Sequence, residues 1–127
     1  MAVLTAADPG LQLALEQLQG SWTTVAGPRQ ARLLIAGHRY TFEFVSGDLY
    51  MGSFDLAGHG EIDMHIEEGP EDHAGRISRC IFRVEGGILR WCPGAPGSDR
   101  RPSTFPDVDD TRYLSLVFRR ARAADRR

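Results

Sequence analysis

The 127-residue sequence contains no lysine and no asparagine, and all fifteen of its basic residues are arginine. Without lysine, the chain has no residue for a Schiff base, for anchoring pyridoxal phosphate or for a phosphate-binding P-loop. Without asparagine, it has no acceptor for N-linked glycosylation. A coding bias would also produce arginine in place of lysine, so the absence by itself indicates no function.

The sequence also lacks any run of 18 apolar residues, so it predicts no membrane-spanning helix. Residues 1–8 carry neither the basic start nor the long apolar core of a secretory signal, and we therefore expect a cytoplasmic protein. The formal net charge of −2 gives no overall attraction to nucleic acid. We expect neither a membrane nor a nucleic acid as partner, and the sequence leaves the oligomeric state open.

Motifs of covalent catalysis are absent too. The chain has no Gly-x-Ser-x-Gly, no Cys-x-x-Cys and no His-Glu-x-x-His, and its only cysteines are Cys80 and Cys92. We predict no cofactor and no resident metal ion. A cysteine beside a histidine can act as a nucleophile, but a buried cysteine is more often inert packing.

Short runs of alternating apolar and polar residues fill most of the chain. Glycine-rich turns separate them, and the alternation is typical of half-buried strands. We predict strands at 21–26, 31–36, 39–45, 50–56, 61–67, 76–85, 88–92 and 113–119. Short strands at this spacing predict an all-β fold, and closing an up-and-down antiparallel barrel of about eight strands would remove its exposed edges.

A short helical pattern precedes the strands. Asp8 suits an N-cap and Pro9 the first helical position, and Leu11, Leu15 and Leu18 lie on one face before Gly20 ends the helix. A helix this short is not stable alone in water, so we expect it to plug or flank one end of the barrel. We predict a single domain with a helix at 8–19, a barrel at 20–120 and a basic tail at 121–127. The tail is either a frayed end or a contact for an acidic partner.

Five segments recur in this order in a bacterial family of conserved hypothetical proteins. They are Leu-Gln-Gly-Ser-Trp at 18–22, Glu-Gly-Pro-Glu at 68–71 with Gly75, Phe-Arg-Val-Glu-Gly-Gly-Ile-Leu at 82–89, Cys92, and Ala-Pro-Gly at 95–97 leading to Arg-Pro-Ser-Thr-Phe at 101–105. Over 18–120 the chain resembles this lipocalin-like family, whose members often look secreted or appended to larger chains. The resemblance implies a lipocalin-like barrel, no particular activity and no catalytic residues.

The resemblance also implies a role for Trp22. In lipocalin-like barrels this tryptophan closes one end, and an arginine of the last strand lies over its ring. Arg119 or Arg120 is placed to make this cation–π contact here. We therefore expect all three residues to be structural.

The period-two rule places an aromatic face inside the barrel. His38, Tyr40, Phe42 and Phe44 share one side of the 39–45 run. Inward residues of an eight-stranded barrel either fill a core or line a pocket for one small ligand. For the pocket we predict the ligand-binding residues Tyr40, Phe42, Phe54, Met64, Phe82 and Trp91, with His38, Tyr40 and Trp91 as polar groups that orient the ligand.

These residues predict binding of a small, mostly apolar molecule inside the barrel. One alternative is an enzyme of the cyclase or isomerase type acting on a hydrophobic biosynthetic intermediate, with His38 and Tyr40 as the catalytic acid–base pair. Another is a protein-interaction module with a filled core. An open cavity would favour the first two, and a filled interior would favour the third.

Acidic and histidine residues alternate at 59–67. His59, Glu61, Asp63, His65 and Glu67 share one strand face, but alternate residues lie about 6.6 Å apart, whereas zinc ligands lie about 2 Å from the ion. At most two neighbours, such as Asp63 and His65, could share an ion with a partner strand. We therefore interpret the run as a solvated outer face.

The connections carry two further expectations. The 93–112 segment is a long proline-rich loop in which Arg100, Arg101, Asp107, Asp109 and Asp110 either gate the mouth of the barrel or belong to a surface excursion. His73 lies in a turn, where we expect it to be exposed to solvent.

The two-residue Gly86-Gly87 turn predicts the register of its hairpin. It places Phe82 opposite Trp91 and Ile81 opposite Cys92. Cys80 then faces inward and Cys92 outward, so the sulfurs lie on opposite faces and no disulfide can form. We predict two free thiols.

Overall fold

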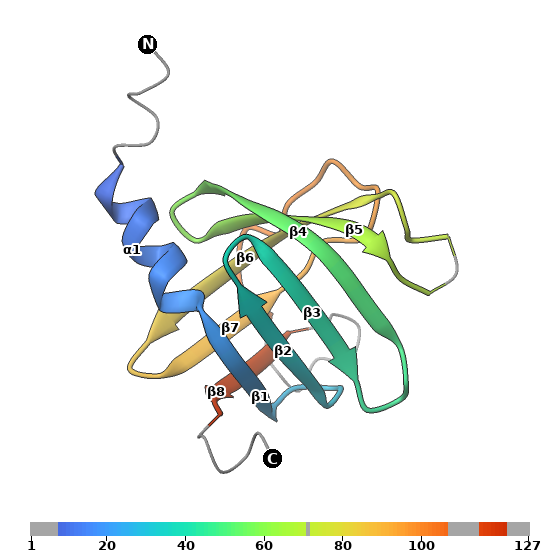
Figure 1. Ribbon diagram of the computed structural model, residues 1–127, viewed down its shortest axis with the longest axis horizontal. Helices are drawn as coiled ribbons and strands as arrows, with labels where there is room; N and C mark the ends of the chain where they lie inside the picture. The colour runs from blue at the N-terminus through green and yellow to red at the C-terminus, as the bar shows by residue number, and fades with distance from the viewer. Residues whose placement is uncertain (1–7, 71, 107–114, 122–127) are drawn as a thin grey trace.

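The computed structural model describes residues 8–70, 72–106 and 115–121, and its strands form a closed antiparallel barrel (Figure 1). Each strand pairs with its neighbours in sequence, and β8 closes onto β1. The elements are α1 (Pro9–Leu18), β1 (Gly20–Ala26), β2 (Ala31–Ala36), β3 (Arg39–Phe44), β4 (Leu49–Gly58), β5 (Glu61–Glu68), β6 (Ile77–Glu85), β7 (Ile88–Cys92) and β8 (Leu116–Arg120). The predicted up-and-down all-β barrel with a short N-terminal helix is confirmed.

Alternation along the strands decides which side chains enter the barrel. In β2, Ala31, Leu33 and Ile35 are buried and the residues between them are exposed. In β3, Tyr40 and Phe42 are buried in the same way, because successive side chains of a strand point to opposite faces. The predicted aromatic inner face is therefore confirmed for the residues within the strand.

Helix α1 begins at its predicted cap. The Asp8 carboxylate accepts hydrogen bonds from the backbone N–H groups of Gly10 and Leu11 at 2.9 and 3.2 Å, and Pro9 occupies the first turn. The helix ends at Leu18 with Gln19 as its C-cap, whereas Gly20 is the first residue of β1 with a φ of 116°. Gly20 thus allows the sharp entry into the sheet one residue after the predicted helix end.

One end of the barrel is closed by α1 and Trp22. Trp22 is fully buried, and its indole Nε1 donates a hydrogen bond to the Leu18 carbonyl at 2.9 Å. The Arg120 guanidinium lies 4.2 Å from the centre of the Trp22 ring. The predicted tryptophan–arginine closure is confirmed with Arg120, while Arg119 is exposed on the outer wall.

The two ends of the barrel differ in what fills them. At the end next to α1, which we call the closed end, large side chains with almost no exposed surface fill the interior: Leu18, Trp22, Phe54, Leu89 and Phe118. At the opposite end, which we call the open end, the β1–β2, β3–β4 and β5–β6 connections surround the start of the loop that follows β7. Inside the barrel, the residues that the structure describes therefore leave space for a ligand toward the open end.

The part of the loop after β7 that the structure describes, residues 93–106, is drawn in orange in Figure 1. Its Arg101 guanidinium donates to the Ile62 and Cys80 carbonyls at 3.2 and 2.9 Å and pairs with the Asp63 carboxylate at 2.5 Å. Arg101 therefore holds this part of the loop on β5 and β6. Asp107, Asp109 and Asp110 lie outside the described residues.

The β6–β7 hairpin has the predicted register. Phe82 pairs with Trp91 and Ile81 with Cys92 across the Gly86-Gly87 turn. Both cysteines are free, as predicted. Cys92 lies on the outer face, yet it is buried because the following loop covers it.

Candidate functional site

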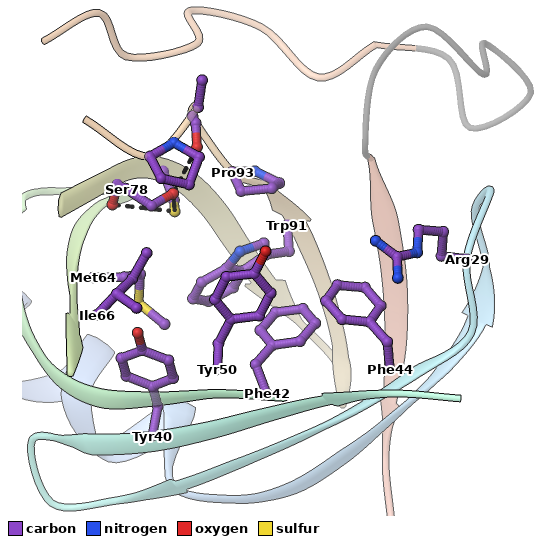
Figure 2. Close-up of a pocket in the computed structure, with 14 residues that line it drawn as sticks. Arg29, Tyr40, Phe42, Phe44, Tyr50, Met64, Ile66, Ser78, Trp91 and Pro93 are labelled. Carbon is purple, nitrogen blue, oxygen red and sulfur yellow. Dashed lines mark hydrogen bonds between the residues drawn. The ribbon is translucent and has the colours of Figure 1, made fainter. Parts of the chain in front are cut away.

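A cavity of about 250 Å³ lies at the open end of the barrel, partly open to the outside (Figure 2). Side chains from β3, β4, β5, β6 and β7 form its walls, and the β1–β2 connection and the start of the post-β7 loop form its rim. The lining residues are Arg29, Tyr40, Phe42, Phe44, Tyr50, Met64, Ile66, Ser78, Cys80, Trp91, Pro93, Gly94, Ala95 and Pro96.

Aromatic rings in mutual contact make the inner wall. The rings of Phe42 and Phe44 stack with their centres 4.9 Å apart, and Trp91 meets Phe42 edge-on at 6.3 Å. Tyr50 meets Phe44 edge-on at 6.1 Å. Such edge and stacked contacts add about 0.5–1.5 kcal/mol each beyond the area they bury, so the wall is held in place without a ligand.

The deep polar groups of the cavity are uncharged. The Tyr40 hydroxyl donates to the His65 carbonyl at 3.4 Å, and burial raises the pKa of Tyr40 above its ordinary value. The Ser78 hydroxyl donates to the Gly94 carbonyl at 2.7 Å. Burial also raises the pKa of Cys80 to about 11, so this thiol stays protonated and is a poor nucleophile near neutral pH.

The charge of the cavity is at its rim. Arg29, from the β1–β2 connection, places its guanidinium carbon 3.9 Å from the centre of the Phe44 ring. The same guanidinium donates through Nη2 to the Ser46 hydroxyl at 2.9 Å and to the Asp48 carboxylate at 3.1 Å. Sequence reasoning missed Arg29, because a residue in a turn belongs to neither face of a strand pattern.

A tyrosine and a histidine meet beside the rim. The Tyr50 hydroxyl lies 2.9 Å from Nδ1 of His73, and their rings stack with centres 5.8 Å apart. His73 is half-buried against Tyr50, so the prediction of a solvent-exposed His73 is wrong. The antiparallel pairing of β4 with β5 brings the β5–β6 connection against the start of β4, because Met51 pairs with Glu68 at the end of β5.

The structure brings four of the six predicted ligand-binding residues to the cavity. Tyr40, Phe42, Met64 and Trp91 line it. Phe54 and Phe82 face inward but do not line the cavity, because they pack in the filled core. The inward face was thus predicted correctly, whereas the division between core and pocket was not.

His38 does not share the cavity with Tyr40. It is exposed in the β2–β3 turn, and the neighbouring Gly37 is bonded to Gln19 at the closed end. The His38 ring contacts the Phe54 carbonyl through Nδ1 at 3.2 Å. The expected inward direction of His38 is wrong because strand alternation does not extend into a turn, and the structure does not bring the proposed acid–base pair together.

The acidic and histidine run of β5 is occupied by ion pairs on the outer wall. Asp63 pairs with Arg79 and Arg101 and Glu67 pairs with Arg39, while Nε2 of His65 lies 3.0 Å from an Asp55 carboxylate oxygen. Among the residues that the structure describes, no three His, Cys, Asp or Glu side chains are grouped to hold a metal ion.

Two further observations concern the chain as a whole. Within 8–70, 72–106 and 115–121, no helix is long and apolar enough to cross a bilayer. A scan against protein-family models and searches of curated proteins and solved structures find no match to this chain.

Proposed function

We propose that the barrel binds a small, mostly apolar molecule in the cavity at its open end. The observation that carries this proposal is the cavity itself: about 250 Å³ of space bounded by aromatic side chains, in a barrel whose other end is filled. Eight-stranded barrels are wide enough to hold one small ligand, in keeping with the lipocalin-like resemblance. We also propose that this chain is related to the lipocalin-like barrels.

The size of the cavity indicates the size of the ligand. A volume of about 250 Å³ lies just below the usual range of roughly 300–1,000 Å³ for ligand pockets. A ligand that buries the equivalent of six to eight CH₂ groups gains about 5–6 kcal/mol before the costs of association. The costs of association subtract from this gain, so we expect a compact ligand with a Kd between about 0.1 and 1 mM.

The geometry supports binding better than either alternative. The proposed catalytic pair, His38 and Tyr40, is divided between the closed end and the cavity, so no specific contact favours a cyclase or isomerase. An interaction module with a filled core would leave no space between Phe44, Tyr50 and Pro93, all of which line the cavity. Ligand binding is thus the function that this cavity supports best.

The proposal can be tested with N-phenyl-1-naphthylamine, a neutral apolar dye that fluoresces when it leaves water. We expect saturable binding by the unmodified protein. The variant Ala95→Trp places a bulky ring on an exposed residue of the rim, and it should weaken binding of the dye at least fivefold. The matched control Ala57→Trp adds the same ring on the exposed outer face of β4 and should bind as the parent does.

Two outcomes would overturn the proposal. One is that the unmodified protein does not bind the dye at concentrations up to the millimolar range. The other is that Ala95→Trp and Ala57→Trp have equal affinities, since the dye would then bind outside the cavity. Thermal melting of both variants ensures that folded proteins are compared.

A further inference from the structure

We infer that the ligand is amphipathic: a compact apolar body carrying one anionic group, such as a carboxylate, that Arg29 binds at the rim. This inference rests on the proposed function and adds the chemical class of the ligand. It is carried by the position of one guanidinium at the outer end of a row of aromatic rings (Figure 2).

Arg29 is the only charged side chain among the residues that line the cavity in the described part of the chain. The remaining lining residues are apolar, hydroxyl-bearing or, for Cys80, a protonated thiol. The one charged group that lines the cavity in the described part of the chain would therefore repel a cationic ligand at the rim. An anion would meet a guanidinium, which is a strong partner for a carboxylate.

The distribution of polarity along the cavity gives the ligand a direction. The inward residues of β3 run from Tyr40 through Phe42 to Phe44, and Arg29 lies 3.9 Å from the Phe44 ring at the outer end of this row. An apolar body would thus lie against the rings, while its charged group stays at the partly open rim. This arrangement avoids the large cost of burying a charge deep in the barrel.

The guanidinium is already oriented for this contact. Its bonds to Ser46 and Asp48 both use Nη2, and stacking on Phe44 fixes the plane of the group. A guanidinium has five N–H donors, so the donors on Nη1 and Nε are available to a planar anion. The Arg29–Asp48 pair is about half exposed, with 40% and 45% of the two side chains accessible, so water screens Asp48 and its repulsion of an anion is weak.

Three ligands of one shape test the inference. We would measure, by isothermal titration calorimetry, the binding of 2-naphthoate, neutral 2-naphthamide and cationic 2-naphthylmethylamine. The partial exposure of Arg29 reduces the strength of a charged hydrogen bond. We therefore expect 2-naphthoate to bind about five- to tenfold more tightly than the amide, and the amine to bind most weakly.

Matched variants assign the preference to Arg29. Arg29→Gln should remove the advantage of 2-naphthoate over the amide, and Arg29→Lys should keep part of it. Arg32→Gln removes the same charge from the exposed outer face of β2 and should leave the preference unchanged. Raising the salt concentration to 0.5 M should reduce the preference in the unmodified protein.

The outcomes separate this inference from the proposed function. Equal binding of the three naphthalenes by the unmodified protein would overturn the anionic class and leave cavity binding intact. A preference for 2-naphthoate that survives undiminished in Arg29→Gln would also overturn it. Failure of all three naphthalenes and of the neutral dye would contradict cavity binding itself. Because the comparison of the three probes needs no variant, the inference stays testable even if Arg29→Gln does not fold.

Discussion

Replacing Arg120 with alanine should destabilise the barrel, because this side chain joins the last strand, the first strand and the helix. Its guanidinium lies 4.2 Å from the centre of the Trp22 ring and donates to the Gln17 carbonyl at 2.7 Å and to the Gln19 carbonyl at 2.5 Å. These carbonyls are at the C-terminal end of α1, where backbone acceptors have no partner within the helix. The change removes all three contacts at once.

The magnitude follows from those contacts. A cation–π contact at an exposed site contributes about 0.5–1 kcal/mol, and each hydrogen bond contributes a net of about 0.5–1.5 kcal/mol. The sum is about 1.5–4 kcal/mol, and the lower half applies because Arg120 is exposed and water can replace it at the carbonyls. We expect a loss of about 2 kcal/mol in the free energy of unfolding, or about 6–10 °C in Tm.

Urea denaturation followed by tryptophan fluorescence measures this loss. Arg119→Ala is the matched control, because it removes the same side chain from the next position of β8, on the outer wall. A double-mutant cycle with Trp22→Leu should give a coupling of about 0.5–1 kcal/mol between the ring and Arg120. If the two arginine variants unfold within 0.5 kcal/mol of each other, the closure of the barrel by Arg120 is refuted.

Three further changes test the burial of Cys80, the anchoring of the loop after β7 and the close approach of β4 and β5. Burial raises the pKa of Cys80 to about 11, so the rate of its labelling in the folded protein should be slow at pH 7 and rise about tenfold per pH unit up to pH 10. After denaturation, two thiols should react with a chromogenic disulfide reagent, whose absorbance measures both the rate and the number of thiols. A labelling rate that does not depend on pH would contradict the burial of Cys80. Asp63→Asn should lower the free energy of unfolding by about 1–3 kcal/mol in urea denaturation, because it weakens two arginine pairs at a side chain that is 18% exposed. The control Asp55→Asn changes a side chain that is 74% exposed and should alter the free energy of unfolding by less than about 0.5 kcal/mol. Equal effects of the two variants would refute the anchoring of the loop by Asp63. Gly52→Ala should lower the free energy of unfolding by about 1–3 kcal/mol, because a Cβ at this position would overlap the His65 carbonyl oxygen. An unchanged Tm in thermal melting would contradict the close approach of β4 and β5.

The barrel fold could be predicted from the sequence, because local sequence patterns determine its strands and turns. The Gly86-Gly87 turn defines a two-residue hairpin, and only one register places Phe82 opposite Trp91 on the inner face. Asp8 and Pro9 likewise mark the start of the helix through cap chemistry that acts over a few residues. Each of these predictions depends on neighbours in sequence.

The cavity could be predicted only in part from the sequence, because its shape depends on contacts between distant segments. Whether an inward residue belongs to core or pocket depends on which end α1 closes, and this places Phe54 in the core and Phe42 at the cavity. Arg29 and His73 lie in turns, where the period-two rule gives no direction for a side chain. The path of the loop after β7 depends on Arg101, whose partners are 21 to 39 residues away in sequence.

Nuclear magnetic resonance of the methionine methyl groups tests cavity binding most directly. Of the two methionines that the structure describes, Met64 lines the cavity, whereas Met51 does not. With the protein labelled at its methionine methyl carbons, and the signals assigned through Met64→Leu and Met51→Leu, we would titrate N-phenyl-1-naphthylamine. Binding in the cavity should shift the Met64 methyl signal saturably and leave the Met51 signal nearly unchanged. A stationary Met64 signal in the presence of bound dye would contradict it.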